Sequence, residues 1–361
     1  MRFFSTRRST ALSTNTVVAG LWCCKAWRTL PSRKSHVPTT GHTRCNNGQG
    51  YPQALISKDG RFSGGSMSLS AADQPRAIAL PRARLTHHGL AFSKSTLEQA
   101  LSLGAFLLEI PQGVDLNPGF ELCRNFYQPR LDTLDRMRGH REHAHPRSKL
   151  GYEDRPNQVE QLQIESHLWH EYFALPVTQL LEAMKILTVQ VLRHLFEASK
   201  VRKEHWATIT GATLDETSLC YTTLNHYRAC VRGTLGIVEH TDSGFITLIA
   251  ADQPGFEILH KGVWQAVALE PRCFIVNLGD AYQILTAHLP LPGRAVLHRV
   301  IETRPSAQAP DRSSFTVYMG PDFDMDLYQY NPSGALDRYQ SFRAFSVQKA
   351  QGMGYAFHSR V

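Results

Sequence analysis

The sequence predicts a mainly β fold with flanking helices, built around a double-stranded β-helix (jelly-roll) core over residues 216–330. From about residue 216 the chain becomes a series of short apolar, β-branched runs separated by turn residues, a pattern typical of antiparallel sandwiches. One long segment with helical periodicity, residues 176–196, precedes these runs and would cover a sheet. Hydrophobic residues make up 42% of the 361, which is enough for one sizeable core.

The chain begins with a basic leader, residues 1–75. Residues 1–58 hold nine Lys and Arg and no Asp or Glu, so the formal charge of +8 belongs to the leader and the remainder sums to −1. A body without excess positive charge argues against nucleic-acid binding. The leader resembles a mitochondrial presequence, while a disordered extension or a misassigned start is an equally weighted alternative. We therefore expect a mitochondrial or cytoplasmic protein.

The region 76–215 is predicted to be mixed α/β. Residues 95–103 form a short helical pattern before an apolar strand at 104–113, and residues 117–137 are predicted to be a second helix. The polar stretch 138–165 is expected to be a mobile flap near a site. The long helix 176–196 carries Pro176 in its first turn, where proline is well tolerated. No apolar run has the length of a membrane span, and we expect a monomer that does not bind membranes.

Two histidines and a carboxylate within the core have the pattern of a metal site. His240 and Asp242 are two residues apart, so on an extended strand both would leave one face, with Thr241 pointing away. His298 lies 58 positions after His240, in the strand-like run 295–301. Two imidazoles and one carboxylate on one side of an ion form the facial arrangement of non-haem Fe(II) oxygenases. The prediction is an Fe(II) site at His240, Asp242 and His298.

An Arg-x-Ser pair follows the second histidine. Arg312 and Ser314 would share one face of a strand that continues to residue 319, and a guanidinium with a neighbouring hydroxyl suits a carboxylate. Arg304 and Ser306 form a rival pair in the Pro- and Ser-rich loop 302–311. We prefer Arg312, because Pro305 argues against a paired central strand around Arg304.

This constellation resembles the 2-oxoglutarate- and Fe(II)-dependent dioxygenases of the isopenicillin N synthase-like family, which have a cupin-like jelly roll. The resemblance spans residues 80–350 and is strongest over 218–322. Besides the metal and Arg-x-Ser motifs, the matching segments are Gly104–Gly113, Asn225-His-Tyr227-Arg228, Gly255–Leu259 with Trp264, Asn277-Leu-Gly279-Asp280 and His298-Arg299-Val300.

Three features depart from the family pattern. Pro111 and Gln112 replace an Asn-His pair, and Asn-His-Tyr-Arg at 225–228 replaces Asn-Tyr-Tyr-Pro. The interval from the second histidine to the preferred arginine is also longer than usual, at fourteen residues (312 − 298). These departures keep open a non-catalytic ligand-binding role.

The resemblance implies an oxidoreductase that uses Fe(II), O2 and 2-oxoglutarate to oxidise a small-molecule substrate, with release of succinate and CO2. Arg312 and Ser314 would bind the distal carboxylate of 2-oxoglutarate, and Tyr227 and Asn225 would complete that wall. Hydroxylation is the default outcome, and desaturation or ring closure are alternatives. A relative that does not use 2-oxoglutarate also remains open.

The remaining cysteines and histidines give no evidence for a second metal site. The seven cysteines include no Cys-x-x-Cys, so a structural zinc site is not supported, and scattered thiols favour a reducing compartment. His140, His143 and His145 are expected to lie in a solvated loop and not to form a second metal site. A helix is expected at 336–345. The tail that follows it, to residue 361, is expected to fold over the barrel.

Overall fold

The structure is a computed structural model that describes residues 77–142, 151–211, 214, 220–303 and 311–352. All of them belong to one compact unit, residues 58–361. The predicted leader, the rival pair Arg304 and Ser306, and the end of the tail lie outside the described residues.

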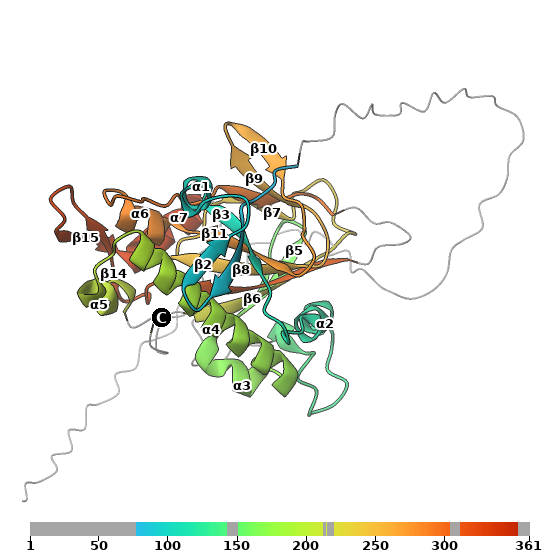
Figure 1. The fold of residues 1–361 in the computed structure, drawn as a ribbon. Coiled ribbons are helices and arrows are strands. Elements are labelled where there is room, and N and C mark those ends of the chain that lie inside the picture. Colours follow the sequence, from blue (N-terminus) through green and yellow to red (C-terminus); the bar gives the residue numbers. More distant parts are fainter. Residues whose placement is uncertain (1–76, 143–150, 212–213, 215–219, 304–310, 353–361) are drawn as a thin grey trace, which may run out of the picture. The chain divides into compact units, whose positions relative to one another are not determined.

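The described part of the chain combines many short strands with a few helices (Figure 1). The strands are β1 Arg82–Thr86, β2 Gly89–Phe92, β3 Ala105–Glu109, β4 Tyr152–Asp154, β5 Val159–Glu165, β6 Cys220–Tyr227, β7 Ile237–His240, β8 Ile246–Ala251, β9 Phe256–His260, β10 Val263–Ala266, β11 Cys273–Leu278, β12 His298–Val300, β13 Arg312–Met319, β14 Asp326–Tyr330 and β15 Leu336–Ser341. The α-helices are α1 Leu97–Leu103, α2 Asn117–Asn125, α3 Trp169–Tyr172, α4 Leu175–Ala198, α5 Trp206–Thr210, α6 Asp280–Thr286 and α7 Phe342–Gly352. Single 3-10 turns occur at η1 His140–Glu142, η2 Ser166–Leu168 and η3 Lys203–His205.

Two sheets face each other, and this is the predicted jelly-roll arrangement. The larger sheet has the strand order β2-β1-β3-β11-β8-β13-β6-β5-β4, and the smaller has the order β10-β9-β12-β7. Alternate residues of a strand leave opposite faces. In β11, Phe274 and Val276 belong to the core cluster under the helices, whereas Ile275 belongs to the cluster shared with the smaller sheet. The outer face of the larger sheet therefore carries the helices, and its inner face lines the space between the sheets.

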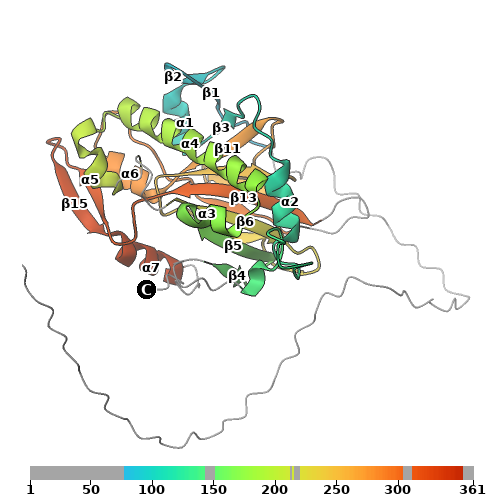
Figure 2. The same cartoon turned by 90° about the horizontal axis from the view of Figure 1, so that it is seen from below.

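The helix α4 covers the outer face of the larger sheet (Figure 2). It matches the predicted long helix, with its proline in the first turn, and it buries eleven side chains. By length and composition alone α4 could cross a membrane, contrary to the expectation that no apolar run is long enough for a membrane span. The core helix of a globular domain can have the same length and composition, and the buried side of α4 packs in the main hydrophobic core.

The helix predicted at 95–103 is confirmed, and the strand predicted at 104–113 is present over Ala105–Glu109, although β1 and β2 precede it. Thr96 and Gln99 form a reciprocal capping box at the start of α1, which explains why the helix begins there. Gly104 ends α1 at φ 81°, a left-handed conformation that suits glycine, and β3 follows directly.

Three predicted elements were wrong in part. The helix predicted at 117–137 ends at Asn125, because Pro129 follows and the carboxylates of Asp132 and Asp135 accept backbone N–H groups in turns. The predicted flap 138–165 instead contains β4 and β5, which extend the larger sheet; residues 143–150 lie outside the described residues. The helix predicted at 336–345 begins only at Phe342, because residues 336–341 pair with β14 as β15.

The histidine cluster also differs from its prediction. His140 is fully buried, and its ring Nε2 lies 3.1 Å from the carbonyl oxygen of Arg136, so it is a core residue and not a loop residue in solvent. His143 and His145 lie outside the described residues. The described cysteines Cys123, Cys220 and Cys273 are free thiols.

Candidate metal and carboxylate site

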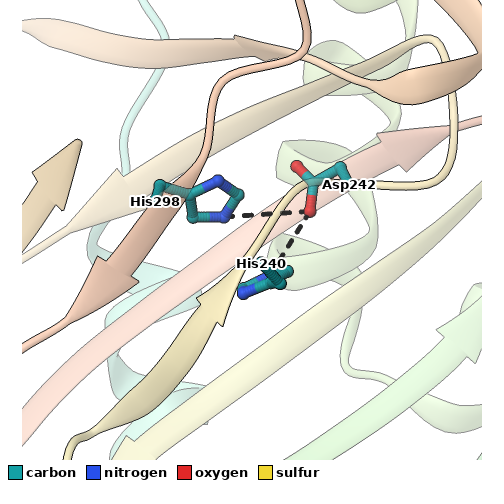
Figure 3. A group of neighbouring side chains, drawn as sticks. All are labelled: His240, Asp242 and His298. Carbon is teal, nitrogen blue, oxygen red and sulfur yellow. Dashed lines mark ion pairs between the residues drawn. The ribbon is translucent and has the colours of Figure 1, made fainter. Parts of the chain in front are cut away.

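The two histidines and the aspartate of the predicted metal site meet between the sheets (Figure 3). One ligand atom from each of His240, Asp242 and His298 lies within 4.8 Å of the other two. His240 ends β7 and His298 begins β12, and the antiparallel register places these two residues directly opposite each other. Because β7 ends at His240, Asp242 is in the following turn and not on the strand, so the predicted strand alternation does not reach it.

Hydrogen bonds orient both imidazoles in the same way. His240 Nδ1 lies 2.9 Å from the carbonyl oxygen of Val238, and His298 Nδ1 lies 3.0 Å from that of Val296. A carbonyl only accepts, so each Nδ1 carries a proton, and in the neutral imidazole each Nε2 then has the lone pair. The two Nε2 atoms lie 3.6 and 3.9 Å from Asp242 Oδ1. All three available ligand atoms therefore point to one place.

Thr247 selects the oxygen with which Asp242 faces the histidines. Its hydroxyl donates to Asp242 Oδ2 at 2.7 Å, which leaves Oδ1 on the histidine side. The turn after β11 fixes the backbone of the same loop, because the N–H of Asp280 donates to the carbonyl of Asp242 at 2.8 Å. A Cβ at Gly279 would lie 2.7 Å from that carbonyl oxygen, so the close approach requires glycine.

The charges of the group suit a cation. Burial alone would raise the pKa of Asp242, but the neighbouring His298 and His240 and the Thr247 hydroxyl hold this pKa well below its usual range. Burial, followed by the nearby His240, lowers the pKa of His298 to about 4. Near neutral pH the group is therefore an ionised carboxylate with an unprotonated His298, which is the protonation state that a divalent metal ion needs.

The predicted carboxylate-binding residues form one wall of the same space. β13 and β6 are antiparallel neighbours, with Arg312 opposite Tyr227 and Ser314 opposite Asn225. The Ser314 hydroxyl accepts a hydrogen bond from Asn225 Nδ2 at 3.1 Å and lies 3.2 Å from the Tyr227 hydroxyl. Gln161 on β5, which the sequence analysis did not single out, donates to Asn225 Oδ1 at 2.6 Å.

Arg312 lacks the partners that a buried guanidinium requires. Its side chain is 2% exposed and stacks over the Tyr227 ring at 4.9 Å, but its Nε and Nη1 have no hydrogen-bond partner among the described residues. Gly255, at φ 134°, comes so close that a side chain there would meet Nη1. A buried, unpaired cation costs several kcal/mol, on the order of what an anionic ligand would offset. The geometry of this wall fits a carboxylate group.

The three residues of the predicted metal site and Arg312 line one cavity of about 880 Å³. Alternate residues of β6 and β13 face into it, as the period of a strand requires. They are Tyr221, Thr223, Asn225 and Tyr227 on β6, and Arg312, Ser314, Thr316 and Tyr318 on β13. The Tyr221 and Tyr318 rings stack at 4.4 Å, beyond the positions that the sequence identified.

The C-terminal helix α7 closes one side of the cavity. Lys349 on α7 donates to the Thr241 hydroxyl at 2.5 Å and contacts the Asp280 carboxylate. Thr241 also donates to Asp280 Oδ2 at 3.0 Å, so this cluster lies directly beside Asp242, the residue that follows Thr241. No sequence signal identified Lys349, because it follows Asp280 by 69 residues and belongs to no motif.

Comparisons with known proteins agree with this geometry. Residues 218–341 match the sequence model of the 2OG-Fe(II) oxygenase superfamily. A gibberellin 2-beta-dioxygenase 8 of Arabidopsis thaliana is 27% identical over 197 residues, which cover 50% of this chain and 55% of that protein. A gibberellin 2-beta-dioxygenase 6 of rice is 34% identical over 116 residues, or 31% of this chain and 30% of that protein. A 1-aminocyclopropane-1-carboxylate oxidase homolog of Solanum lycopersicum is 32% identical over 130 residues, or 34% of each. The chain thus spans about a third to half of these relatives.

Solved structures share the fold over more of the chain. JOX2 in complex with 2OG, Fe and JA has a TM-score of 0.60 at 19% identity, covering 79% of this chain and 89% of that one. The rice dioxygenase for auxin oxidation has a TM-score of 0.57 at 20% identity, covering 77% of this chain and 96% of that one. These likenesses establish a common jelly-roll architecture.

Proposed function

We propose that this chain, whose residues 218–341 belong to the 2OG-Fe(II) oxygenase superfamily, is an Fe(II)- and 2-oxoglutarate-dependent oxygenase that oxidises a small molecule. One observation carries the proposal: a buried arginine, whose Nε and Nη1 have no hydrogen-bond partner among the described residues, shares a cavity with a His-Asp-His group of metal-ligand geometry. A metal group and a carboxylate receptor in one cavity are what a reaction using a metal-chelating dicarboxylate needs.

His240, Asp242 and His298 would hold Fe(II) through two Nε2 atoms and Asp242 Oδ1. Iron bound there would supply the redox chemistry that activates O2. The protein's own part is orientation: the carbonyls of Val238 and Val296 fix the two imidazoles, and Thr247 fixes the carboxylate. Because all three protein ligands would lie on one side, iron held there would remain accessible to 2-oxoglutarate and O2 from the cavity.

Arg312 and Ser314 would bind the distal carboxylate of 2-oxoglutarate. The guanidinium offers a planar pair of donors, and Ser314 can donate its hydroxyl because Asn225 already donates to it. Tyr227 contributes its ring beneath the guanidinium and its hydroxyl beside Ser314. Asn225 is itself held in place by a hydrogen bond that its Oδ1 accepts from Gln161. A rigid strand is suited to this task, because productive chelation depends on a fixed orientation.

The substrate would occupy the remainder of the cavity, near Tyr221, Tyr318 and Lys349. A volume of about 880 Å³ lies in the range of small-molecule sites. Succinate, CO2 and a hydroxylated product are the expected outcome, in which one atom of O2 enters succinate and the other enters the substrate. We propose a monomer that acts without nucleic acid or membrane, in line with the near-neutral charge of residues 59–361.

A second candidate is an oxidase of the same fold that does not use 2-oxoglutarate. The similarity to a 1-aminocyclopropane-1-carboxylate oxidase homolog favours it. The unpaired donors of Arg312 favour the first candidate, since an enzyme without a dicarboxylate co-substrate leaves them without a ligand.

The test is succinate formation from added 2-oxoglutarate by the Fe(II)-loaded protein in air, in the presence of fractionated metabolite extract. We expect some fractions to raise the rate and to yield a product heavier by one oxygen atom. The matched control is His298→Ala, which removes one ligand of the metal group. If no fraction stimulated succinate formation above that control, the proposed oxygenase activity would be rejected.

A further inference from the structure

His226 lies directly behind the carboxylate wall and takes no part in the site described above. It stands between Asn225 and Tyr227 on β6, so its side chain leaves the opposite face of the sheet. The residue is 4% exposed. Its Nδ1 lies 2.8 Å from Glu160 Oε1 and its Nε2 lies 2.9 Å from Asp311 Oδ2.

The two hydrogen bonds define the charge of this imidazole. Ionised carboxylates only accept, so both ring nitrogens of His226 must carry protons, and only the imidazolium has both. Loss of one proton would leave a nitrogen lone pair facing a carboxylate oxygen. His226 is therefore a cation clamped between two anions.

The remaining groups around His226 keep both carboxylates ionised. Glu160, fully buried, accepts from Arg141 at 2.8 Å and from the Tyr152 hydroxyl at 2.6 Å. Asp311 accepts from the N–H of Ala229 at 3.1 Å. Tyr127 stacks on the His226 ring at 3.9 Å, and Arg141 lies over the Tyr127 ring at 5.5 Å. The charged groups facing the imidazole are therefore Glu160, Asp311 and Arg141, with Tyr127 and Tyr152 as neutral neighbours.

This clamp is connected to the carboxylate receptor through the backbone. Asp311 immediately precedes Arg312, the first residue of β13. In the β6–β13 ladder His226 pairs with Ser313 and Tyr227 pairs with Arg312. In the β5–β6 ladder His226 pairs with Glu160. The His226 bonds therefore join three neighbouring strands at the point where β13 begins.

We propose that His226 is a positioning residue for 2-oxoglutarate binding: as an imidazolium it holds Asp311, and with it the start of β13, so that Arg312 keeps its orientation. The proposal rests on the proposed role of Arg312. It assigns a purpose to the histidine that replaces tyrosine in the Asn-x-Tyr motif at 225–227.

The sign of the pH dependence follows from the clamp. Burial alone would lower the pKa of His226, but its bonds to Asp311 and Glu160 and their charges raise it above the ordinary value of 6.5. Glu160, for which burial is opposed by donors from His226, Tyr152 and Arg141, has its pKa lowered to about 2. The clamp is complete below pH 6.5 and is lost as the pH rises through the raised pKa of His226.

Binding of 2-oxoglutarate to the Fe(II)-loaded protein, measured by anaerobic calorimetry between about pH 6 and 9, tests the proposal. The wild-type Kd should rise about tenfold over this range, which corresponds to about 1.4 kcal/mol. His226→Gln should bind weakly throughout and lose the pH dependence. The exposed His288→Gln is the matched control and should follow the wild type.

Asp311→Asn separates positioning from a general structural role. A neutral His226 can donate to Glu160 and accept from the new amide, so this variant should keep tight binding at high pH. A merely structural pair would be weakened at every pH. An unchanged pH slope in His226→Gln or weak binding by Asp311→Asn at high pH would contradict the proposal.

NMR of the metal-free protein gives a readout that needs no activity. The imidazole signals of His226, assigned from His226→Gln, should titrate above the range of exposed histidines, and the Arg312 Nε–H signal should move with the same midpoint. This coupling in a protein that fails to bind 2-oxoglutarate would sustain the positioning role and reject the proposed function. An ordinary His226 midpoint, or an Arg312 signal indifferent to it, would overturn the inference.

Discussion

Thr247 decides which oxygen of Asp242 faces the two histidines, and it shows how far single residues control the site. Its hydroxyl holds Oδ2 at 2.7 Å, so Oδ1 alone is presented to a metal ion. Groups that orient metal ligands in this way usually contribute about 10- to 100-fold to metal affinity.

We predict that Thr247→Val weakens Fe(II) binding by about 10- to 100-fold. Thr188→Val, which removes a buried hydroxyl in α4 remote from the site, is the matched control and should leave iron binding unchanged. His240→Ala and His298→Ala should abolish binding, and Asp242→Ala should nearly do so, because two protein ligands do not compete with water for a labile ion. Metal analysis after dialysis measures all of these. Stoichiometric iron in either histidine variant would overturn the assignment of the ligands.

Arg312 is the second residue whose chemistry can be separated from its charge. Arg312→Lys keeps the positive charge but loses the planar fork, so we expect half-saturating 2-oxoglutarate to rise by one to two orders of magnitude, or about 1.4–2.8 kcal/mol. Arg304→Lys tests the rival Arg-x-Ser pair and should change it by less than about twofold. A 2-oxoglutarate titration in which Arg304 is sensitive and Arg312 is silent would reject Arg312 as the carboxylate receptor.

Among the elements, α7 has a role that no sequence motif indicated. Its Lys349 joins the helix to the loop that carries Thr241 and Asp242. The side chains of Lys349 and Asp280 are 17% and 14% exposed, so their contact is largely sheltered from solvent. Lys349 also reaches Thr241, the residue between two of the proposed ligands. The helix therefore stabilises the loop that carries Asp242.

Lys349→Met should lower the free energy of unfolding by about 1.5–3 kcal/mol, the range for a hydrogen bond to a charged group. The exposed Lys94→Met is the control, and urea denaturation at neutral pH is the measurement. The double variant with Asp280→Asn should be less destabilised than the sum of the two single variants. Strict additivity would show that the two side chains do not interact.

Local sequence patterns predicted correctly those elements whose formation depends on residues close by in the sequence. The helical pattern at 95–103 and the apolar stripe of 176–196 were predicted in this way, and the capping box at Thr96 explains where the first of these helices begins. Residues 336–341 were not, because their strand exists through pairing with β14. The polar segment before residue 165 was misread for a related reason: Glu160 is buried because His226, Arg141 and Tyr152 meet its carboxylate. Such partners lie far along the chain.

For the whole molecule, the spacing of motifs identified residues that the fold brings together. The seven residues chosen from the sequence all line one cavity: His240, Asp242, His298, Arg312, Ser314, Asn225 and Tyr227. Thr247, Gln161 and Lys349 were missed because residues of these types are common and carry no spacing signal. These residues orient others across neighbouring strands and helices, and the pairing of those elements cannot be predicted from local sequence patterns.

The basic leader, residues 1–75, lies outside the described residues. We propose that it is a mitochondrial presequence. Deleting residues 1–58 should then leave catalysis and thermal stability unchanged while moving the protein out of mitochondria. Fluorescence microscopy of tagged full-length and truncated chains, with thermal unfolding of both, makes the comparison. Loss of folding on truncation, or an unchanged location, would contradict the targeting role.

The most direct test of the central claim is the amount of succinate formed per O2 consumed by the Fe(II)-loaded protein with 2-oxoglutarate and its substrate. If His240, Asp242 and His298 hold the iron and Arg312 holds the co-substrate, each O2 consumed should yield one succinate, and Arg312→Lys should restore this ratio only at higher 2-oxoglutarate. Consumption of O2 without succinate would instead identify an oxidase of the same fold. Stoichiometric iron without any O2 uptake would contradict an enzymatic role altogether.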